Sequence, residues 1–253
     1  MIDTVLFDIG GTLHTVTNNE TLRTLFAKRL RERLADYGID LIGEDCEIGL
    51  RLHENAEVYK HHSEEILSEL PAKRIWGEFY LKDYQISEDK IAPIAEELSF
   101  LYDYERVRNM RRPGLLETLE TLRGLGMRMG VVSNIISTSF VPHILKEYGI
   151  ESYMDCIVMS SEVGIRKPNP AIFEHALQQL GAKRENTAYI GDTLSRDVLG
   201  ARNAKLALMI LINNPAIAHR DVGLAGSGIE PDCRINTLTE IPGIISDYNK
   251  SHS

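Results

Sequence analysis

The chain alternates short apolar stretches with longer amphipathic ones. Residues 4–7 form an apolar, β-rich stretch, and similar stretches recur at residues 129–132, 156–159, 188–190 and 206–212. The segments between the later stretches carry apolar residues at three- and four-residue spacing, namely Leu115–Leu125, Ser137–Tyr148, Ala171–Leu180 and Ser195–Asn203. Buried strands that alternate with helices are typical of a parallel sheet covered on both faces. The pattern therefore predicts an α/β fold with a Rossmann-like three-layer core around a parallel sheet.

One interval is too long for this rhythm. Residues 8–128 separate the first predicted strand from the second, which is far more chain than one crossover helix needs. Residues 15–112 show almost no strand pattern, but they contain amphipathic stretches at Leu22–Leu34, Glu44–Tyr59, Ile75–Tyr84 and Lys90–Tyr104. We expect these stretches to form an inserted all-helical cap domain over residues 15–112. The core domain then comprises residues 1–14 and 113–253, with the return point near the Pro113-Gly114 pair.

Composition excludes several classes of protein. The hydrophobic fraction of 43% is sufficient for a packed core, and the net charge of -9 does not favour binding to nucleic acids. No apolar run approaches the roughly 20 residues of a membrane span, and MIDTVLFDIGG lacks the features of a signal peptide. We therefore expect a cytoplasmic protein, a monomer or homodimer, with no nucleic-acid or membrane partner. Cys46, Cys156 and Cys233 form no CxxC pair and are predicted to be reduced, buried thiols.

Polar residues follow the predicted strands at the points where those strands end. Asp8-Ile9-Gly10-Gly11-Thr12 follows the first strand, and Ser133-Asn134 follows the second. Lys167 comes after the third strand, and residues 191–197, with Asp192 and Asp197, come after the fourth. Ligands of open parallel sheets bind beyond the carboxyl ends of the strands, where these loops meet. Any one of these residues could be a turn or capping residue, but four groups in this order predict a site.

This order and spacing resembles the haloacid dehalogenase (HAD) superfamily. The family pattern has an Asp-led DxDGT loop, a Ser or Thr after strand two, a Lys, and a GDxxxD-type acidic loop. Here Asp8 begins the first loop, and Val131-Val132-Ser133-Asn134, Lys167-Pro168-Asn169-Pro170 and Ile190-Gly191-Asp192 are close to the later motifs. The insertion at residues 15–112 also lies where part of that family places a helical cap. The resemblance implies a hydrolase, most often a phosphatase of small phosphorylated metabolites.

The resemblance also implies a role for each matching residue. Asp8 would attack phosphorus and form an aspartyl-phosphate, with Lys167 and Ser133 as further catalytic residues. Phosphate would bind to Ser133, Asn134, Lys167, Gly11 and Thr12. Mg²⁺ would bind to Asp8, the carbonyl of Gly10, Asp192 and, in the same acidic loop, Asp197.

The sequence departs from the family pattern at Gly10, where most phosphatases of the superfamily have the second Asp of DxDGT. That Asp normally protonates the leaving group and then activates water, which is worth about 10²–10⁴-fold in rate. A backbone carbonyl at this position survives the change, but the acid–base group does not. Weak hydrolysis, a bias towards good leaving groups, replacement by a cap residue and loss of turnover are all compatible with Gly10.

Three alternative functions remain open on the sequence. A non-catalytic protein that binds phosphate or a metabolite would explain Gly10. In a metal-independent 2-haloacid dehalogenase Asp8 would displace halide from carbon, but that branch usually has a bulky aromatic residue at this position and no need of Gly191-Asp192. A phosphonate hydrolase would use a cap lysine, for which Lys60 and Lys73 are the candidates.

The predicted cap offers polar side chains but no recognisable site. His61 and His62 are adjacent, so they do not share a helix face and do not predict a metal pair. A cluster of arginines precedes the return to the core, and we expect it to form a solvated face: Arg106, Arg108, Arg111 and Arg112.

Overall fold

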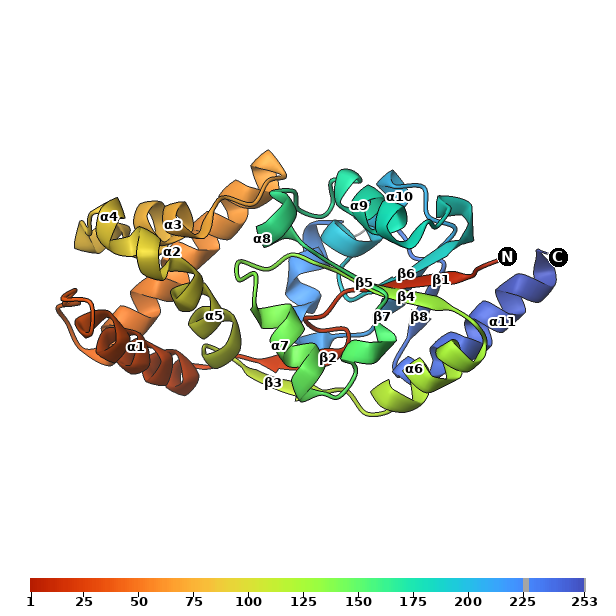
Figure 1. Cartoon of the computed structure of the whole chain (residues 1–253), viewed down its shortest axis with the longest axis horizontal. Helices are drawn as coiled ribbons and strands as arrows, with labels where there is room; N and C mark the ends of the chain where they lie inside the picture. The colour runs from red at the N-terminus through yellow and green to blue at the C-terminus, as the bar shows by residue number, and fades with distance from the viewer. Residues whose placement is uncertain (225–227, 253) are drawn as a thin grey trace.

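A computed structural model describes residues 1–224 and 228–252, and its core is a six-stranded sheet (Figure 1). The strand order is β5-β4-β1-β6-β7-β8, and every neighbouring pair is parallel. The strands are β1 (Thr4–Phe7), β4 (Arg128–Ser133), β5 (Cys156–Met159), β6 (Thr187–Gly191), β7 (Leu208–Ile212) and β8 (Cys233–Ile235). The predicted α/β core with a parallel sheet is confirmed.

Alternate residues of the central strands pack into two separate hydrophobic clusters, one on each face of the sheet. Val5 and Phe7 of β1 belong to the cluster with helices α6 and α7, whereas Leu6 faces the helices α9 and α10. This period of two is what a buried strand requires when both faces are covered. The core helices are α6 (Leu115–Gly124), α7 (Phe140–Glu147), α8 (Ser160–Val163), α9 (Ala171–Leu180), α10 (Leu199–Asn203) and α11 (Ile241–Ser251).

A helical cap lies beside the carboxyl ends of the strands and has its own hydrophobic core (Figure 1). Trp76, Tyr80 and Tyr102 form its centre, with ring centroids 4.8–6.2 Å apart. Trp76 is fully buried, and its indole N–H donates to Ser99 at 2.9 Å. The helices are α1 (Glu20–Ala35), α2 (Asp45–Ile66), α3 (Ala72–Arg74), a π-helical turn (Ile75–Tyr80), α4 (Glu88–Ile91) and α5 (Ala95–Glu105). The expected helical insertion is confirmed.

Two short strands at the base of the cap correct the expectation that the insertion is all-helical. β2 (His14–Thr17) pairs antiparallel with β3 (Arg108–Arg111), so the two chain segments that connect cap and core form one ribbon. Each of these strands has only four residues, and β3 is largely exposed. They therefore lack the apolar run by which the core strands could be recognised. The proposed limits at residues 14/15 and 112/113 fall within or beside this ribbon and stay predictions.

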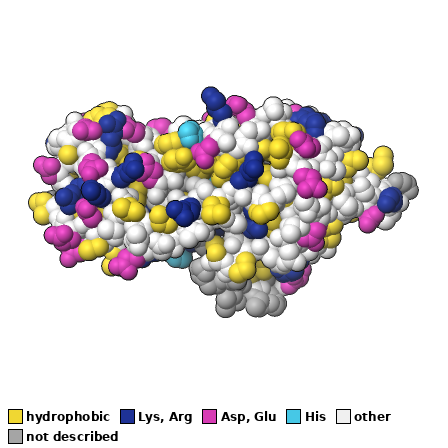
Figure 2. Space-filling model, turned by 90° about the horizontal axis from the view of Figure 1, so that it is seen from below, with side chains coloured by type: hydrophobic (Ala, Val, Ile, Leu, Met, Phe, Trp, Pro, Cys, Tyr) yellow, Lys and Arg dark blue, Asp and Glu magenta, His cyan; other side chains and the backbone are white. Residues whose placement is uncertain are grey.

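Three smaller findings complete the fold. Strand β8 and helix α11 extend the core beyond the elements that the pattern predicted. All three cysteines are free, but only Cys156 is buried, and the prediction is wrong for Cys46, which is exposed on α2. No helix within the described ranges has the length and hydropathy of a membrane span. Figure 2 shows Lys and Arg side chains interspersed with Asp and Glu over the face seen from below.

Candidate active site

The register of the sheet brings the strand-end residues to one edge. Phe7 of β1 pairs with Val131 of β4 and with Ile190 of β6, so these three strands end at nearly the same level. Asp8 directly follows β1, and its backbone N–H donates to the carbonyl of Ile190 at 2.9 Å. Its carboxylate therefore lies beside the loop that follows β6. Asp8 is 8% exposed and therefore almost completely buried.

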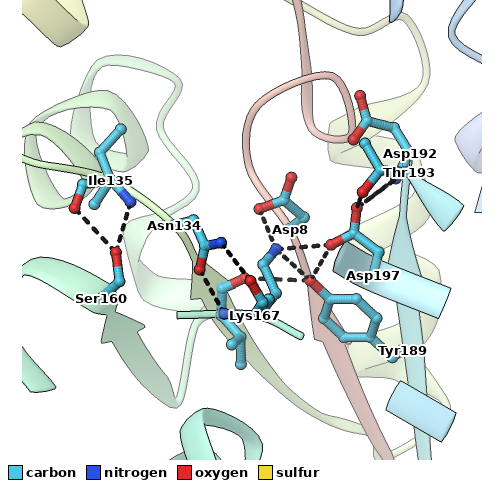
Figure 3. Close-up of polar contacts among 10 residues, drawn as sticks. Asp8, Asn134, Ile135, Ser160, Lys167, Tyr189, Asp192, Thr193 and Asp197 are labelled. Carbon is cyan, nitrogen blue, oxygen red and sulfur yellow. Dashed lines mark hydrogen bonds and ion pairs between the residues drawn. The ribbon is translucent and has the colours of Figure 1, made fainter. Parts of the chain in front are cut away.

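Lys167 lies at the centre of a buried polar cluster (Figure 3). Its Nζ donates to Asp8 Oδ1 at 2.8 Å, to Asp197 Oδ1 at 2.7 Å and to the Tyr189 hydroxyl at 2.7 Å. Burial alone would lower the pKa of Lys167, but the carboxylates of Asp197 and Asp8 hold it above its ordinary value. Burial raises the pKa of Asp8, and the Lys167 ammonium offsets part of this rise. The ion pair thus fixes one oxygen of Asp8, and no described group donates to the other, Oδ2.

Asp197 is held by hydrogen bonds at both oxygens. Oδ1 accepts from Lys167 and from the Tyr189 hydroxyl at 3.0 Å. Oδ2 accepts from the Thr193 hydroxyl at 2.5 Å and from the backbone N–H groups of Thr193 and Asp192. Burial would raise the pKa of Asp197, but Lys167 and Arg196 lower it to about 2. Its carboxylate therefore organises the site, and the bonds leave it a poorer metal ligand than the sequence suggested.

Asp192 differs from Asp197 because one of its oxygens is left open. Oδ2 accepts from the Asn214 amide at 2.7 Å, whereas Oδ1 is buried without a hydrogen-bond partner among the described residues. Burial, with the nearby Asp197 and Asp8 carboxylates, raises the pKa of Asp192 to about 7. Gly11 approaches so closely that a Cβ there would lie 1.7 Å from Asp192 Oδ2, and its φ of +81° is also strained for other residues. Asp192 thus carries one buried oxygen that has no hydrogen-bond partner among the described residues.

The donor set fits a hard divalent cation. Asp8, Asp192 and Asp197 each offer an oxygen, and these atoms lie within 4.8 Å of one another. Oxygen ligands and a local excess of carboxylates are what Mg²⁺ prefers. Asp192, whose Oδ1 has no partner among the described residues, and Asp8, which has one oxygen outside its bond to Lys167, are the two best ligands.

The remaining predicted residues have different surroundings. Ser133 ends β4 and is 3% exposed, and its hydroxyl makes no hydrogen bond within the described residues. Thr12 is fully buried, also with an unpartnered hydroxyl. The Asn134 amide accepts from the Lys167 backbone N–H at 2.9 Å and donates to the Lys167 carbonyl at 3.0 Å. Its side chain is therefore engaged in holding Lys167, and only its backbone is left for phosphate.

Gly10 leaves open space beside Asp8. A Cβ added at Gly10 would meet no heavy atom within 4 Å, and its φ is not positive. The position where the family pattern has an acid–base carboxylate is therefore neither filled by another side chain nor closed by the backbone.

Three residues of the site or its walls carry no signal among the sequence motifs. Tyr189 reads as an ordinary residue of a buried strand, yet its hydroxyl bridges Lys167 and Asp197. Asn214 follows β7, so the strand-end rule that found Asp8 could have found it. Arg196 lies near the acidic cluster, and Asp197, Asp192 and Asp8 keep its pKa above the ordinary value although burial opposes this.

Arg112 corrects the expectation of a solvated arginine face. Its guanidinium donates to the Gly11 carbonyl at 2.6 Å and 3.1 Å, so it holds the loop after β1. Arg108 and Arg111 are exposed as expected, and Arg106 lies 4.3 Å from the centre of the Tyr102 ring.

The two cap lysines proposed for a phosphonate hydrolase are both paired with acidic residues. Lys60 forms an ion pair with Glu57 at 3.1 Å, and Lys73 forms one with Glu88 at 2.6 Å. The Lys73 side chain is 47% exposed, unlike the desolvated lysine that an imine mechanism requires.

Comparisons with known proteins identify the relatives of this chain. A family model described as haloacid dehalogenase-like hydrolase matches residues 2–205. The glyceraldehyde 3-phosphate phosphatase of Methanothermobacter thermautotrophicus is 29% identical over 227 residues, covering 87% of this chain and 90% of the relative.

Two solved structures share the fold of the whole chain. A HAD phosphatase from Thermococcus onnurineus is 24% identical with a TM-score of 0.62, covering 96% of this chain and 98% of that one. A 2-haloacid dehalogenase from Pseudomonas syringae pv. Tomato is also 24% identical with a TM-score of 0.64, covering 98% and 100%. At this identity the likeness extends to the fold and does not choose between their two reactions.

Proposed function

Because the chain belongs to the haloacid dehalogenase-like hydrolase family, we propose that it is a phosphatase that hydrolyses a small phosphorylated metabolite through an aspartyl-phosphate at Asp8. The observation that carries this proposal is the buried cluster in which Lys167 fixes one oxygen of Asp8, and in which Asp8 and Asp192 offer oxygens within 4.8 Å of each other. A carboxylate held in this way is oriented for nucleophilic attack and lies next to positive charge that can bind a phosphoryl group.

The first half-reaction transfers the phosphoryl group to Asp8. The Asp8 carboxylate attacks phosphorus, and the bond from phosphorus to the ester oxygen breaks as that oxygen leaves with its electron pair. Lys167 and the Ser133 hydroxyl would bind the other phosphoryl oxygens, the first as a compact charge and the second as a neutral donor. Water then attacks the aspartyl-phosphate, which releases phosphate and restores the Asp8 carboxylate.

The acidic cluster would hold Mg²⁺ through Asp8, Asp192 and, by analogy with the family, the carbonyl of Gly10. When bound, the ion supplies positive charge between two groups that would otherwise repel, the Asp8 carboxylate and the phosphate ester. Asp197 would act through its hydrogen bonds, because it orients Lys167 and the backbone of Thr193.

Gly10 sets the expected limits of the activity. Without an acid beside the ester oxygen, that oxygen must leave as an anion, which favours esters with acidic leaving groups such as aryl phosphates. The cap would cover the site and exclude water, and its residues would select the metabolite. We retain a cytoplasmic location, and a monomer or homodimer, as predictions.

The test is phosphate release from an aryl phosphate and from alkyl phosphates that include glyceraldehyde 3-phosphate, with Mg²⁺ and with chelator. We expect Mg²⁺-dependent turnover of the aryl ester and much slower turnover of alkyl esters. Asp8→Asn should reduce release to background, whereas Asp40→Asn, a matched change at an exposed carboxylate, should not.

Two other results would replace the proposal. Phosphate binding without release from any ester would indicate the non-catalytic protein, which Gly10 favours. Chloride release from 2-chloropropionate in the presence of chelator would indicate a dehalogenase. That reaction needs no metal, so it would not require Asp192 as a ligand.

A further inference from the structure

A segment of the cap pairs with the core directly before Lys167. The Glu69 backbone N–H donates to the Gly164 carbonyl at 3.0 Å, and the Arg166 N–H donates to the Leu67 carbonyl at 3.2 Å. Ser68 and Ile165 form an antiparallel bridge between these two bonds. The chain after α2 therefore lies along residues 164–166 like a short additional strand. The core segment that leads into Lys167 takes its conformation partly from the cap.

The side chain of Glu69 strengthens this contact. Its carboxylate is only 1% exposed and accepts from three donors: the Arg166 guanidinium, the Ser160 hydroxyl at 2.6 Å and the Tyr59 hydroxyl. Two of these donors belong to the core, and Tyr59 belongs to α2 in the cap. A carboxylate removed from water is stable only when it is paired and hydrogen-bonded, so the buried position of Glu69 depends on these donors.

Each core partner of Glu69 is linked closely to a predicted phosphate-binding residue, one through the chain and the other through a hydrogen bond. Arg166 is the residue before Lys167. The Ser160 hydroxyl accepts from the Ile135 N–H at 2.9 Å, and Ile135 follows Asn134, whose amide holds the Lys167 backbone by two hydrogen bonds (Figure 3). Through Ser160 and Arg166, Glu69 therefore contacts both loops that would bind phosphate, the loop after Ser133 and the loop that carries Lys167.

The position of this contact suits a latch. The cap is connected to the core through the β2–β3 ribbon, and the end of α2 that leads to Glu69 lies beside α8, at the opposite side of the molecule (Figure 1). If the cap moves about the ribbon, the part of the cap around Glu69 moves farthest, so this motion would make or break the Glu69 contact.

We propose that Glu69 is a positioning residue through which the docked cap orders the two phosphate-binding loops. The proposal rests on the proposed phosphatase function, because it concerns how tightly and how productively those loops bind phosphate. Glu69 does not touch the reacting atoms.

The test compares Glu69→Ala and Ser160→Ala with Ser99→Ala. Ser99 accepts the hydrogen bond of Trp76 inside the cap and contacts no core loop, so its variant loses cap stability alone. We expect the first two variants to lower kcat/KM for an aryl phosphate by about 10²-fold, as for small displacements of positioning groups. Inorganic phosphate should inhibit them more weakly than the wild type, and Ser99→Ala should retain wild-type values per folded molecule.

Three further experiments distinguish a positioning role of Glu69 from an effect on the stability of the fold. The rise in Tm caused by inorganic phosphate should be smaller in Glu69→Ala than in the wild type, because coupling between cap docking and phosphate binding is reciprocal. The Glu69→Ala/Ser160→Ala double variant should lose little more than either single variant, since both interrupt one route. Glu69→Gln keeps the acceptor for Ser160 and removes the charge that faces Arg166, so an intermediate loss is expected even if the alanine variant folds poorly.

The outcomes distinguish this proposal from the proposed function. A wild-type protein that neither releases nor binds phosphate would overturn both. An active wild type whose kcat/KM and phosphate inhibition are unchanged in Glu69→Gln and Ser160→Ala would overturn only the role of Glu69.

Discussion

The core and the cap use buried polar side chains in different ways. In the core, Asp8, Lys167 and Asp197 face one another at the carboxyl ends of the strands and form a site among themselves. In the cap, the buried Glu69 and the partly buried Glu96 accept hydrogen bonds from core residues. The core residues form the site itself, whereas the cap residues bond to core segments around it. Substitutions in the core should therefore change the reaction rate, and substitutions in the cap should change how well the core loops are ordered.

Gly10→Asp gives the largest expected effect, because the core lacks one group that its geometry can accept. The open space at Gly10 should admit an aspartate, and an acid beside the ester oxygen is worth about 10²–10⁴-fold in rate. We expect a rise of this size in kcat for alkyl esters and a smaller rise for an aryl ester.

The matched control for this variant is Gly11→Ala. A Cβ at Gly11 would collide with Asp192 Oδ2, so this neighbouring substitution should lower activity towards both esters. An unchanged alkyl-ester rate in folded Gly10→Asp would show that the missing acid does not limit turnover.

Lys167→Met tests how far the core cluster depends on its central cation. Removing the ammonium leaves Asp8 and Asp197 buried without their partner, which should cost about 3–5 kcal/mol of unfolding free energy at pH 7. Urea denaturation measures this loss. Arg33→Met, which removes an exposed cap ion pair with Glu97, should change the stability far less. Similar losses of unfolding free energy in Lys167→Met and Arg33→Met would mean that the core cluster depends on its cation no more than the exposed cap ion pair does.

The comparison also explains which features could be predicted from sequence. Asp8, Lys167 and Asp192 follow strands, so local hydrophobic pattern and order along the chain were sufficient to predict that they meet. The Tyr189 hydroxyl could not be predicted, because nothing distinguishes it from other apolar residues of β6 until Lys167 is placed. The β2–β3 ribbon could not be predicted either, because its strands contain no apolar run.

The Glu69 contact lay beyond sequence reasoning for a different reason. It joins residues 91 and 97 positions apart along the chain, through one cap turn and two core loops. Local pattern predicts elements, but it does not predict which side of a cap meets which loop. Leu67, with its φ of 52°, turns the chain at this point, and such a conformation is visible only in the structure.

Glu96→Ala sharpens the comparison within the cap. Glu96 accepts from the Ser137 hydroxyl at 2.7 Å and from the N–H groups of Thr138 and Ser139, at the start of α7. Loss of this acceptor for the buried Ser137 hydroxyl should cost about 1–3 kcal/mol of stability. Since these residues do not contact Lys167, inhibition by phosphate should be unchanged, unlike in Glu69→Ala. Weakened phosphate inhibition in Glu96→Ala would mean that cap docking as a whole, and not Glu69 in particular, orders the site.

Asp103→Asn should have an effect on stability that depends on pH. Burial raises the pKa of Asp103 to about 7 in the folded protein, although the Ser137 N–H and Arg106 oppose the rise, against 3.8 for an unperturbed aspartate. Between these two values the folded protein binds a proton that the unfolded chain has lost, so the contribution of Asp103 to stability falls as pH rises through this window. Asparagine keeps an acceptor for the Ser137 N–H and does not titrate.

The Tm of Asp103→Asn minus that of the wild type should therefore increase between about pH 4 and pH 7 and then stay constant. Asp40→Asn, at an exposed position, should show no such trend. A difference that does not vary with pH would mean that Asp103 is ionised in the folded protein over the whole range. The carboxylate would then belong with Glu69 and Glu96 as a charged acceptor for the core loops, and the cap would hold those loops by charge at all three points.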